Sequence, residues 1–246
     1  MGRTMNNEPS PTKWLADITR LLPVRSQFVL SGEIRDLVLL RSHDTSAPVP
    51  LLRALWTSLQ ALGYEFILVH DRVDGVRVYP AEREVIARAT GLLPEVGLQN
   101  GRAPVQLDGT LVETMRSVVN LRQARAAFVM DFASRLVPTP SQLDEAHHQF
   151  YVACEKLSLE AAPALPPGAS AGPLYNPVVW LLNRGQDLPS WLLLDSERIS
   201  THTLPPPRRQ DRLDAARMLA PRFQDGTGAS PPAVERFADD FAAGTD

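Results

Sequence analysis

Polar residues follow three short apolar runs of the sequence, at positions where a ligand could bind. Gly32 ends the run that begins at Gln27, Asp131 follows Ala126–Met130, and Asn183 follows Pro177–Leu182. A carboxylate at such a position can hold a divalent cation through water, and a glycine lets the backbone approach an anion. The structural alternatives are a cap at the strand end for Asp131 and an ordinary Asn-Arg-Gly turn for Asn183.

These apolar runs are typical of strands, and most of them lack the polar alternation of a half-exposed strand. Arg198–Leu204 does alternate, as a strand at the exterior of a sheet should. The expected strands are Gln27–Ser31, Glu65–Asp71, Val76–Tyr79, Ala126–Met130, Pro177–Leu182 and Arg198–Leu204. Ile34–Leu40 extends the first strand or forms a second one. Arg41–Pro50 and Ala161–Pro173 are expected to be loops by composition.

Apolar residues at helical spacing separate most of the expected strands. The expected helices cover residues 11–22, 51–62, 81–93, 109–124, 142–159, 211–219 and 231–243. Strands that alternate with helices predict an α/β fold, a mainly parallel sheet covered on both faces. In such a sheet ligands bind beyond the carboxyl ends of the strands, where Gly32, Asp131, Asn183 and the pair His70-Asp71 fall.

Composition limits the class of protein. The chain has 246 residues, a formal net charge of −3 and a single cysteine, Cys154. One cysteine excludes a disulfide framework, and no apolar run approaches the roughly 18 residues of a membrane span. Near-neutral charge gives no general attraction for nucleic acid, and no specific nucleic-acid site is evident. We expect a cytoplasmic globular protein with a disordered tail at 1–10, in which most arginines are solvated surface charges.

The order of the strand-end residues, together with the local sequence, resembles the AAA+ ATPase module. The stretch NPVVWLLNRGQDLPSWLLLDSERISTHTLPPPRRQDRLDAARML resembles that family's run from the sensor strand through the arginine-finger region into the lid. Ala126–Phe132 resembles a Walker B strand, and PAVERFADDFAAGTD resembles a later lid helix. The match covers about half of the chain well and the rest by the order of elements.

The resemblance implies a P-loop NTPase-like αβα sandwich over 11–207 and the start of a helical lid over 208–246. It implies that Asp131 holds Mg²⁺ through water and that Asn183, at the sensor-1 position, orients water or senses the γ-phosphate of ATP. Arg198 falls near the arginine-finger position, which acts on a neighbouring subunit. The implied partner is a second copy or a sister AAA+ domain in a ring, with a protein substrate or client.

Two departures from the family's pattern predict that the hydrolytic parts are lost. The sequence has no G-x-x-x-x-G-K-[ST], and the loop after the first strand reads Ser31-Gly32-Glu33-Ile34-Arg35-Asp36. Such a phosphate loop aims backbone N–H groups and a lysine at the phosphates. Phe132 stands where a catalytic acid would follow Asp131, and it cannot accept a proton.

We therefore expect a degenerate AAA+ module that is deficient in nucleotide binding and acts as a structural or regulatory ring element. One alternative is an active ATPase in which Gly32 and Arg35 replace the usual loop and Asp131 keeps Mg²⁺. Another is an α/β protein-interaction module that binds no nucleotide.

Overall fold

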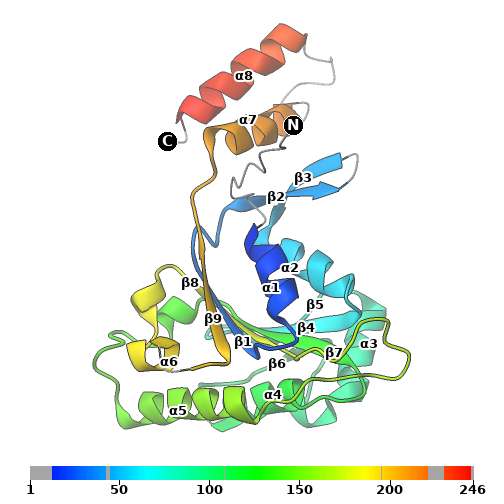
Figure 1. Ribbon diagram of the computed structural model, residues 1–246, viewed down its shortest axis with the longest axis vertical. Coiled ribbons are helices and arrows are strands. Elements are labelled where there is room, and N and C mark those ends of the chain that lie inside the picture. Colours follow the sequence, from blue (N-terminus) through cyan, green and yellow to red (C-terminus); the bar gives the residue numbers. More distant parts are fainter. Residues whose placement is uncertain (1–12, 43–44, 108, 195, 221–229, 245–246) are drawn as a thin grey trace, which may run out of the picture.

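The computed structural model describes residues 13–42, 45–107, 109–194, 196–220 and 230–244, which centre on one seven-stranded sheet (Figure 1). Its strand order is β6-β5-β4-β7-β8-β1-β9. Five strands run parallel: β1 (Gln27–Gly32), β4 (Tyr64–Asp71), β7 (Arg125–Met130), β8 (Val178–Leu182) and β9 (Ile199–Leu204). At one edge β5 (Gly75–Tyr79) and β6 (Arg102–Ala103) are antiparallel. The expected mainly parallel sheet is confirmed.

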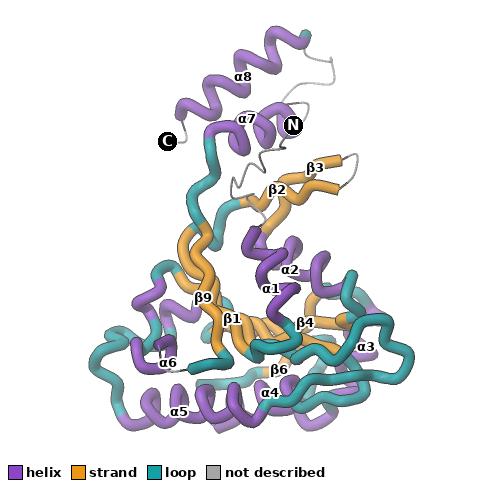
Figure 2. Tube along the Cα trace, in the orientation of Figure 1, coloured by secondary structure: helices purple, strands orange, loops and turns teal. Residues whose placement is uncertain are grey.

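Helices cover both faces of the sheet, which makes the three-layer sandwich that the sequence predicts (Figure 2). One face packs against α1 (Lys13–Leu21) and α2 (Leu51–Gln60). The other packs against α3 (Arg83–Leu92), α4 (Gly109–Val119), α5 (Glu145–Glu160) and the short α6 (Ser190–Leu194). Successive residues of β1 alternate between the two cores, with Val29 in one and Phe28 and Leu30 in the other. This double burial explains why the strands read as unbroken apolar runs.

The expectation of a loop over Arg41–Pro50 is wrong. Two strands, β2 (Leu37–Ser42) and β3 (Thr45–Pro50), pair antiparallel and form a separate hairpin between β1 and α2. The prolines of β3 hid it, because proline cannot donate to a ladder and is found mainly in edge strands. In a two-stranded sheet each strand has a free edge, so Pro48 and Pro50 can be tolerated there. The hairpin occupies the stretch of chain in which a phosphate loop would lead into its helix.

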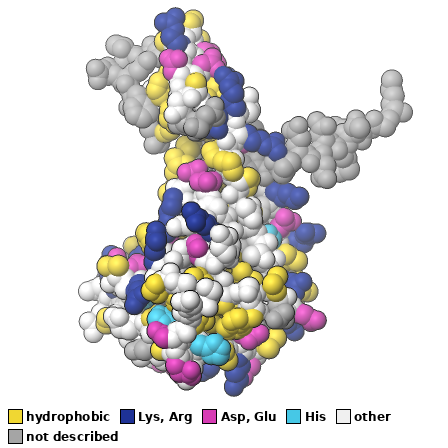
Figure 3. Space-filling model, turned by 90° about the vertical axis from the view of Figure 1, so that its left-hand side faces the viewer, with side chains coloured by type: hydrophobic (Ala, Val, Ile, Leu, Met, Phe, Trp, Pro, Cys, Tyr) yellow, Lys and Arg dark blue, Asp and Glu magenta, His cyan; other side chains and the backbone are white. Residues whose placement is uncertain are grey.

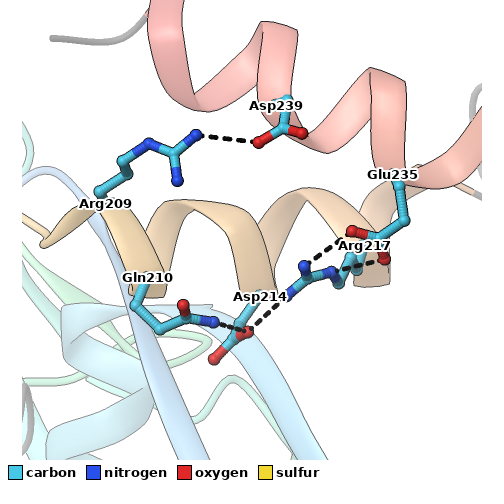
Figure 4. Close-up of polar contacts among 6 residues, drawn as sticks. All are labelled: Arg209, Gln210, Asp214, Arg217, Glu235 and Asp239. Atoms are coloured by element: carbon cyan, nitrogen blue, oxygen red, sulfur yellow. Dashed lines mark hydrogen bonds and ion pairs between the residues drawn. The ribbon is translucent and has the colours of Figure 1, made fainter.

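Two helices follow the sheet, α7 (Arg209–Leu219) and α8 (Pro231–Gly244), and they stand beyond the β2–β3 hairpin (Figure 1). Their shared core is small, with Leu213, Ala216, Ala238 and Ala242 buried. Arg209 pairs with Asp239 at 2.9 Å, and Arg217 pairs with Glu235 at 2.8 Å (Figure 4). Exposed pairs of this kind stabilise little. Charged side chains of both signs cover this end of the molecule (Figure 3).

Asn176, a buried residue just before β8, links three elements of the core. Its amide Nδ2 donates to the carbonyl oxygens of Val118 at 3.1 Å and Leu121 at 2.8 Å, and its Oδ1 accepts from the backbone N–H of Ala126 at 3.1 Å. The side chain thus joins the end of α4 to the start of β7. It satisfies polar groups that water cannot reach.

Replacing Asn176 by alanine is expected to lower the free energy of unfolding by about 2 kcal/mol, because the N–H of Ala126 is left buried without an acceptor. Urea unfolding followed by circular dichroism measures this change. Asn120→Ala, at an exposed residue nearby, is the matched control and should stay within about 0.5 kcal/mol of the parent. Equal stabilities of the two variants would contradict the role given to Asn176.

None of the helices in the described parts of the chain is both long and apolar enough to cross a bilayer. The expected disordered tail at 1–10 lies outside the described residues.

Candidate functional site

A pocket of about 240 Å³ lies at the carboxyl ends of the central strands, where the fold predicts a ligand site. Apolar side chains from β4, β7, β8 and α2 form most of its wall. Its polar lining residues are Arg35, Arg77 and Asp131. Two of these, Arg35 and Asp131, were expected from the sequence, and the structure brings them together.

The carboxylate of Asp131 is already occupied by groups of the protein. Arg35 Nη2 lies 2.7 Å from Asp131 Oδ1, and the same oxygen accepts the backbone N–H of Phe132 at 2.8 Å. Only 15% of the Asp131 side chain is exposed, against 47% of the Arg35 side chain. A guanidinium therefore stands beside the oxygen that would otherwise face a hydrated cation.

Phe132 adopts a left-handed backbone conformation, with φ of 50°, and half of it is exposed. Such a conformation costs a non-glycine residue about 1 kcal/mol or more. The guanidinium carbon of Arg35 lies 3.9 Å from the centroid of the Phe132 ring, a cation–π contact. Arg35 is thus held by both a carboxylate and an aromatic face. The sequence identified Phe132 as a missing acid but gave no sign of this contact.

Gly32 serves the packing of the sheet and does not open a phosphate nest. Its φ is +106°, and a Cβ at this position would collide with the carbonyl oxygen of Leu204 on β9. Its N–H donates to the carbonyl of Asn183 at 3.2 Å. The glycine is therefore required for the close approach of β1 to β9.

Three further backbone amides of this loop are also used internally. The N–H of Glu33 donates to the carbonyl of Leu204 at 3.2 Å, that of Ile34 to Gly32 at 2.7 Å, and that of Asp36 to Glu33 at 3.4 Å. A phosphate loop works by directing free N–H groups at phosphate oxygens. Here four amides of residues 32–36 point at protein carbonyls. The residues present do not fit ATP with Mg²⁺ bound in the usual manner.

Asn183 lies beside Gly32, as the strand order predicts, and is exposed. Its backbone N–H donates to Ser134 Oγ at 2.7 Å, which fixes the end of β8 to the turn after β7. Ser134 was not expected from the sequence, because a serine in a short polar stretch carries no signal of its own. The role of Asn183 as sensor 1 stays a prediction.

Arg198 lies at the opposite end of the sheet, because it precedes β9 and β9 runs parallel to β1. Its Nη1 donates to the hydroxyl of Tyr175 at 2.5 Å and to the carbonyl of Val24 at 3.4 Å. It also lines an open hollow of about 560 Å³ with Arg25, Glu197 and Leu194. The structure therefore does not bring Arg198 to Asp131 within one chain.

His70 lies on β4 next to Asp71, but the two side chains do not act as a pair. Asp71 Oδ1 accepts the backbone N–H groups of Val73 at 2.9 Å and Asp74 at 2.8 Å, which makes it the cap of a turn. His70 is fully buried, and its Nε2 lies 3.3 Å from the carbonyl oxygen of Val105. Burial lowers the pKa of His70, against smaller opposing effects of Val105 and Asp71.

Acidification is expected to destabilise the protein through His70. Its folded pKa lies below the unfolded value of about 6.5, so its contribution is complete above about pH 6.5 and is lost as the pH falls through the lower folded pKa. The slope is at most about 1.4 kcal/mol for each pH unit. Urea midpoints at pH 7.5 and 5 measure this loss of stability, and His70→Gln should make the two midpoints more alike.

Part of the pH dependence should remain in this variant, because burial also lowers the pKa of His202. His148→Gln, at an exposed residue, serves as the control.

Within the described residues, no group of three or more His, Cys, Asp or Glu side chains is placed to hold a metal ion. Asp131 is the one carboxylate of the pocket lining, and Arg35 neutralises it. Arg77, the remaining charged residue of the lining, was missed by the sequence reading. The sequence predicts Val76–Tyr79 as a strand of a hairpin and gives no sign that Arg77 faces a pocket. That position follows from the pairing of β5 with β4.

The sheet order and the two helical layers define a Rossmann-like α/β sandwich, with a pocket at the carboxyl ends of its strands. The family described as "AAA+ chaperone, N-terminal Rossmann-like domain" matches residues 5–205, and the chain belongs to this family. Proteins of the AAA+ class usually bind ATP and Mg²⁺. The predicted resemblance to AAA+ proteins is thereby confirmed.

A solved structure of the HORMA:CdnC:Trip13 complex from E. coli MS115-1 contains a similar chain. The identity is 15% and the TM-score 0.44, over 93% of this chain and 65% of that chain. This chain therefore spans a little under two thirds of the length of that one. No curated protein sequence matches the chain.

Proposed function

We propose that this chain is a nucleotide-binding-deficient AAA+ module that works in the cytoplasm as a structural or regulatory element of a ring. The observation that carries the proposal is the internal use of the amides of Gly32, Glu33, Ile34 and Asp36. A triphosphate bound there would have to break these hydrogen bonds and also displace Arg35 from Asp131. The loop contains no lysine that could repay this cost through a terminal phosphate.

The proposal assigns residues 11–207 to the αβα core and residues 208–246, which include α7 and α8, to a helical lid region. These two helices share a small core of their own, separate from the two cores of the sheet, which supports this division. Four buried side chains stabilise such a two-helix unit only weakly. The partner would be a second copy of the chain or a sister AAA+ domain that retains a complete phosphate loop. A protein substrate or client would be handled by the whole assembly.

Titration with ATP and Mg²⁺ tests the nucleotide deficiency. Calorimetry is expected to show no saturable binding up to about 1 mM ATP. Arg35→Ala, which frees the carboxylate of Asp131, should not restore binding, because the loop amides stay bonded to protein carbonyls. Micromolar binding that Asp131→Ala abolishes would overturn the proposal and support an active ATPase with an atypical phosphate site.

Light scattering tests the assembly separately. We expect the chain to associate with itself or with an active AAA+ domain, and the association should not depend on added nucleotide. A chain that stays monomeric and ignores AAA+ partners would support the alternative of a protein-interaction module outside any ring.

A further inference from the structure

The pocket at the carboxyl ends of the strands keeps a positive charge that its own lining does not neutralise. Arg35 and Asp131 neutralise each other at 2.7 Å. Arg77 of β5 lines the same pocket, is half-buried, and makes no ion pair or side-chain hydrogen bond with any described residue. The lining therefore carries two guanidinium groups and one carboxylate, a net charge of +1.

The neighbour of Arg77 on the sheet increases this positive potential. Arg102 on β6 is the register partner of Arg77, so two arginines lie directly opposite each other on adjacent strands. Like charges in this arrangement destabilise a strand pair. An anion bound at Arg77 would relieve the repulsion.

The rest of the pocket is apolar. Val69 and Val129 follow Arg77 across β4 and β7 in register, which places the three side chains on one face of the sheet. Val69, Val129, Leu181 and Leu51 are all at most 3% exposed and form the closed floor of the pocket. Pro50, which is exposed, and Leu52, which is half-buried, present its accessible apolar surface. The volume of about 240 Å³ lies below the roughly 300–1,000 Å³ of pockets that hold drug-sized ligands. Such a space suits a ligand smaller than these.

We propose that this pocket binds a short aliphatic monocarboxylate, with its carboxylate on Arg77 and its hydrocarbon body against Pro50 and Leu52, the apolar lining residues that keep accessible surface. A monoanion matches the net charge of +1, and a planar carboxylate matches the fork of a guanidinium. A phosphate dianion fits less well, since it would face Asp131 and find the amides of the loop occupied. The ligand can be a free short-chain acid or the carboxyl-terminal residue of a polypeptide. This inference goes beyond the proposed function and does not depend on ring assembly.

Calorimetry with isovalerate tests the proposal on the full chain. We expect a Kd on the order of 1 mM, as for a ligand of few atoms. Isovaleramide, which has the same body without the charge, should bind at least about tenfold more weakly, as should isovalerate to Arg77→Gln. Arg83→Gln, at an exposed residue of α3 on the other face of the sheet, should bind like the parent. Circular dichroism confirms that each variant is folded.

Two further probes complete the experiment. A pentapeptide that ends in valine, with a free or an amidated carboxyl terminus, separates the two sources of carboxylate. Tighter binding of the free-acid peptide than of isovalerate would assign the site to polypeptide termini, and the reverse would assign it to small acids. The proposal is overturned if acid and amide bind alike, if Arg77→Gln has no effect, or if inorganic phosphate binds more tightly than isovalerate.

Discussion

Replacing Arg125 by methionine is expected to lower the free energy of unfolding by about 3 kcal/mol. Arg125 is 1% exposed at the start of β7, and its guanidinium lies among backbone carbonyls, with no carboxylate partner among the residues that the structure describes. Nη1 donates to Leu62 at 2.6 Å, and Nη2 donates to Ala171 at 2.8 Å and Gly172 at 2.6 Å. The side chain thus attaches the 161–173 segment and the end of α2 to the sheet.

Methionine keeps the apolar stem of Arg125 and removes the donors, so the variant isolates the hydrogen bonds from the packing. Three charge-assisted bonds are lost, and the loss is partly offset because the carbonyls lie near the surface and can bind water. Arg122→Met is the matched control, since Arg122 donates to Ala162 and Pro163 of the same segment from an exposed position. Its cost should stay below about 1 kcal/mol.

Urea unfolding at neutral pH measures both variants. Equal losses would mean that burial adds nothing to the arginine–carbonyl contacts. An unchanged Arg125→Met would mean that the segment is held by other groups.

The sequence predicts the sheet well because burial on both faces leaves a strong signal. Runs such as Ala126–Met130 and Pro177–Leu182 admit few readings other than buried strands, and the alternation of Arg198–Leu204 identifies the edge strand β9. The β2–β3 hairpin gives no such signal. Its pairing depends on contact between two segments, and the prolines of β3 favour a loop in any reading of local propensity.

Arginine is the residue type for which sequence reasoning fails most clearly. Most arginines are expected at the surface, and yet Arg125 is one of the most buried side chains of the described chain. Nothing in its sequence neighbours distinguishes it from Arg122, because the carbonyls that satisfy it come from residues 46 or more positions away. Arg77 is a similar case, since its unpaired state depends on the register of β5 against β4 and β6.

The candidate site could be predicted in outline. The strand-end rule places Gly32, Asp131 and Asn183 at one edge of the sheet, and the structure confirms that placement. The rule could not predict that Arg35 would bind Asp131, or that the amides of Gly32 and Glu33 would bond to the carbonyls of Asn183 and Leu204. Those contacts follow from the close approach of β1 to β9 at Gly32, which is a property of the folded sheet.

The nucleotide deficiency that we propose and the position of Arg198 would fit one arrangement in a ring. A module that binds no nucleotide can still contribute to hydrolysis if it presents a guanidinium to the site of its neighbour. Arg198 lies at the end of the sheet opposite Asp131, and its Nη1 is held by Tyr175. Its other guanidinium nitrogens have no hydrogen-bond partner among the described residues, and the residue lines an open hollow. A guanidinium that is held at one nitrogen and accessible at the others could contact the nucleotide site of a partner subunit.

Replacing Arg198 by alanine is therefore expected to lower kcat of a partner AAA+ ATPase in the assembly by about 10³-fold, since a finger arginine stabilises the charge of the transition state. The rate of phosphate release by the assembled complex measures it. Arg198→Lys should recover only part of the rate, because an ammonium group lacks the bidentate fork. Arg25→Ala is the matched control, since Arg25 lines the same hollow. Equal losses from Arg25→Ala and Arg198→Ala would indicate a general effect of surface charge, and a partner indifferent to Arg198→Ala would refute the assignment.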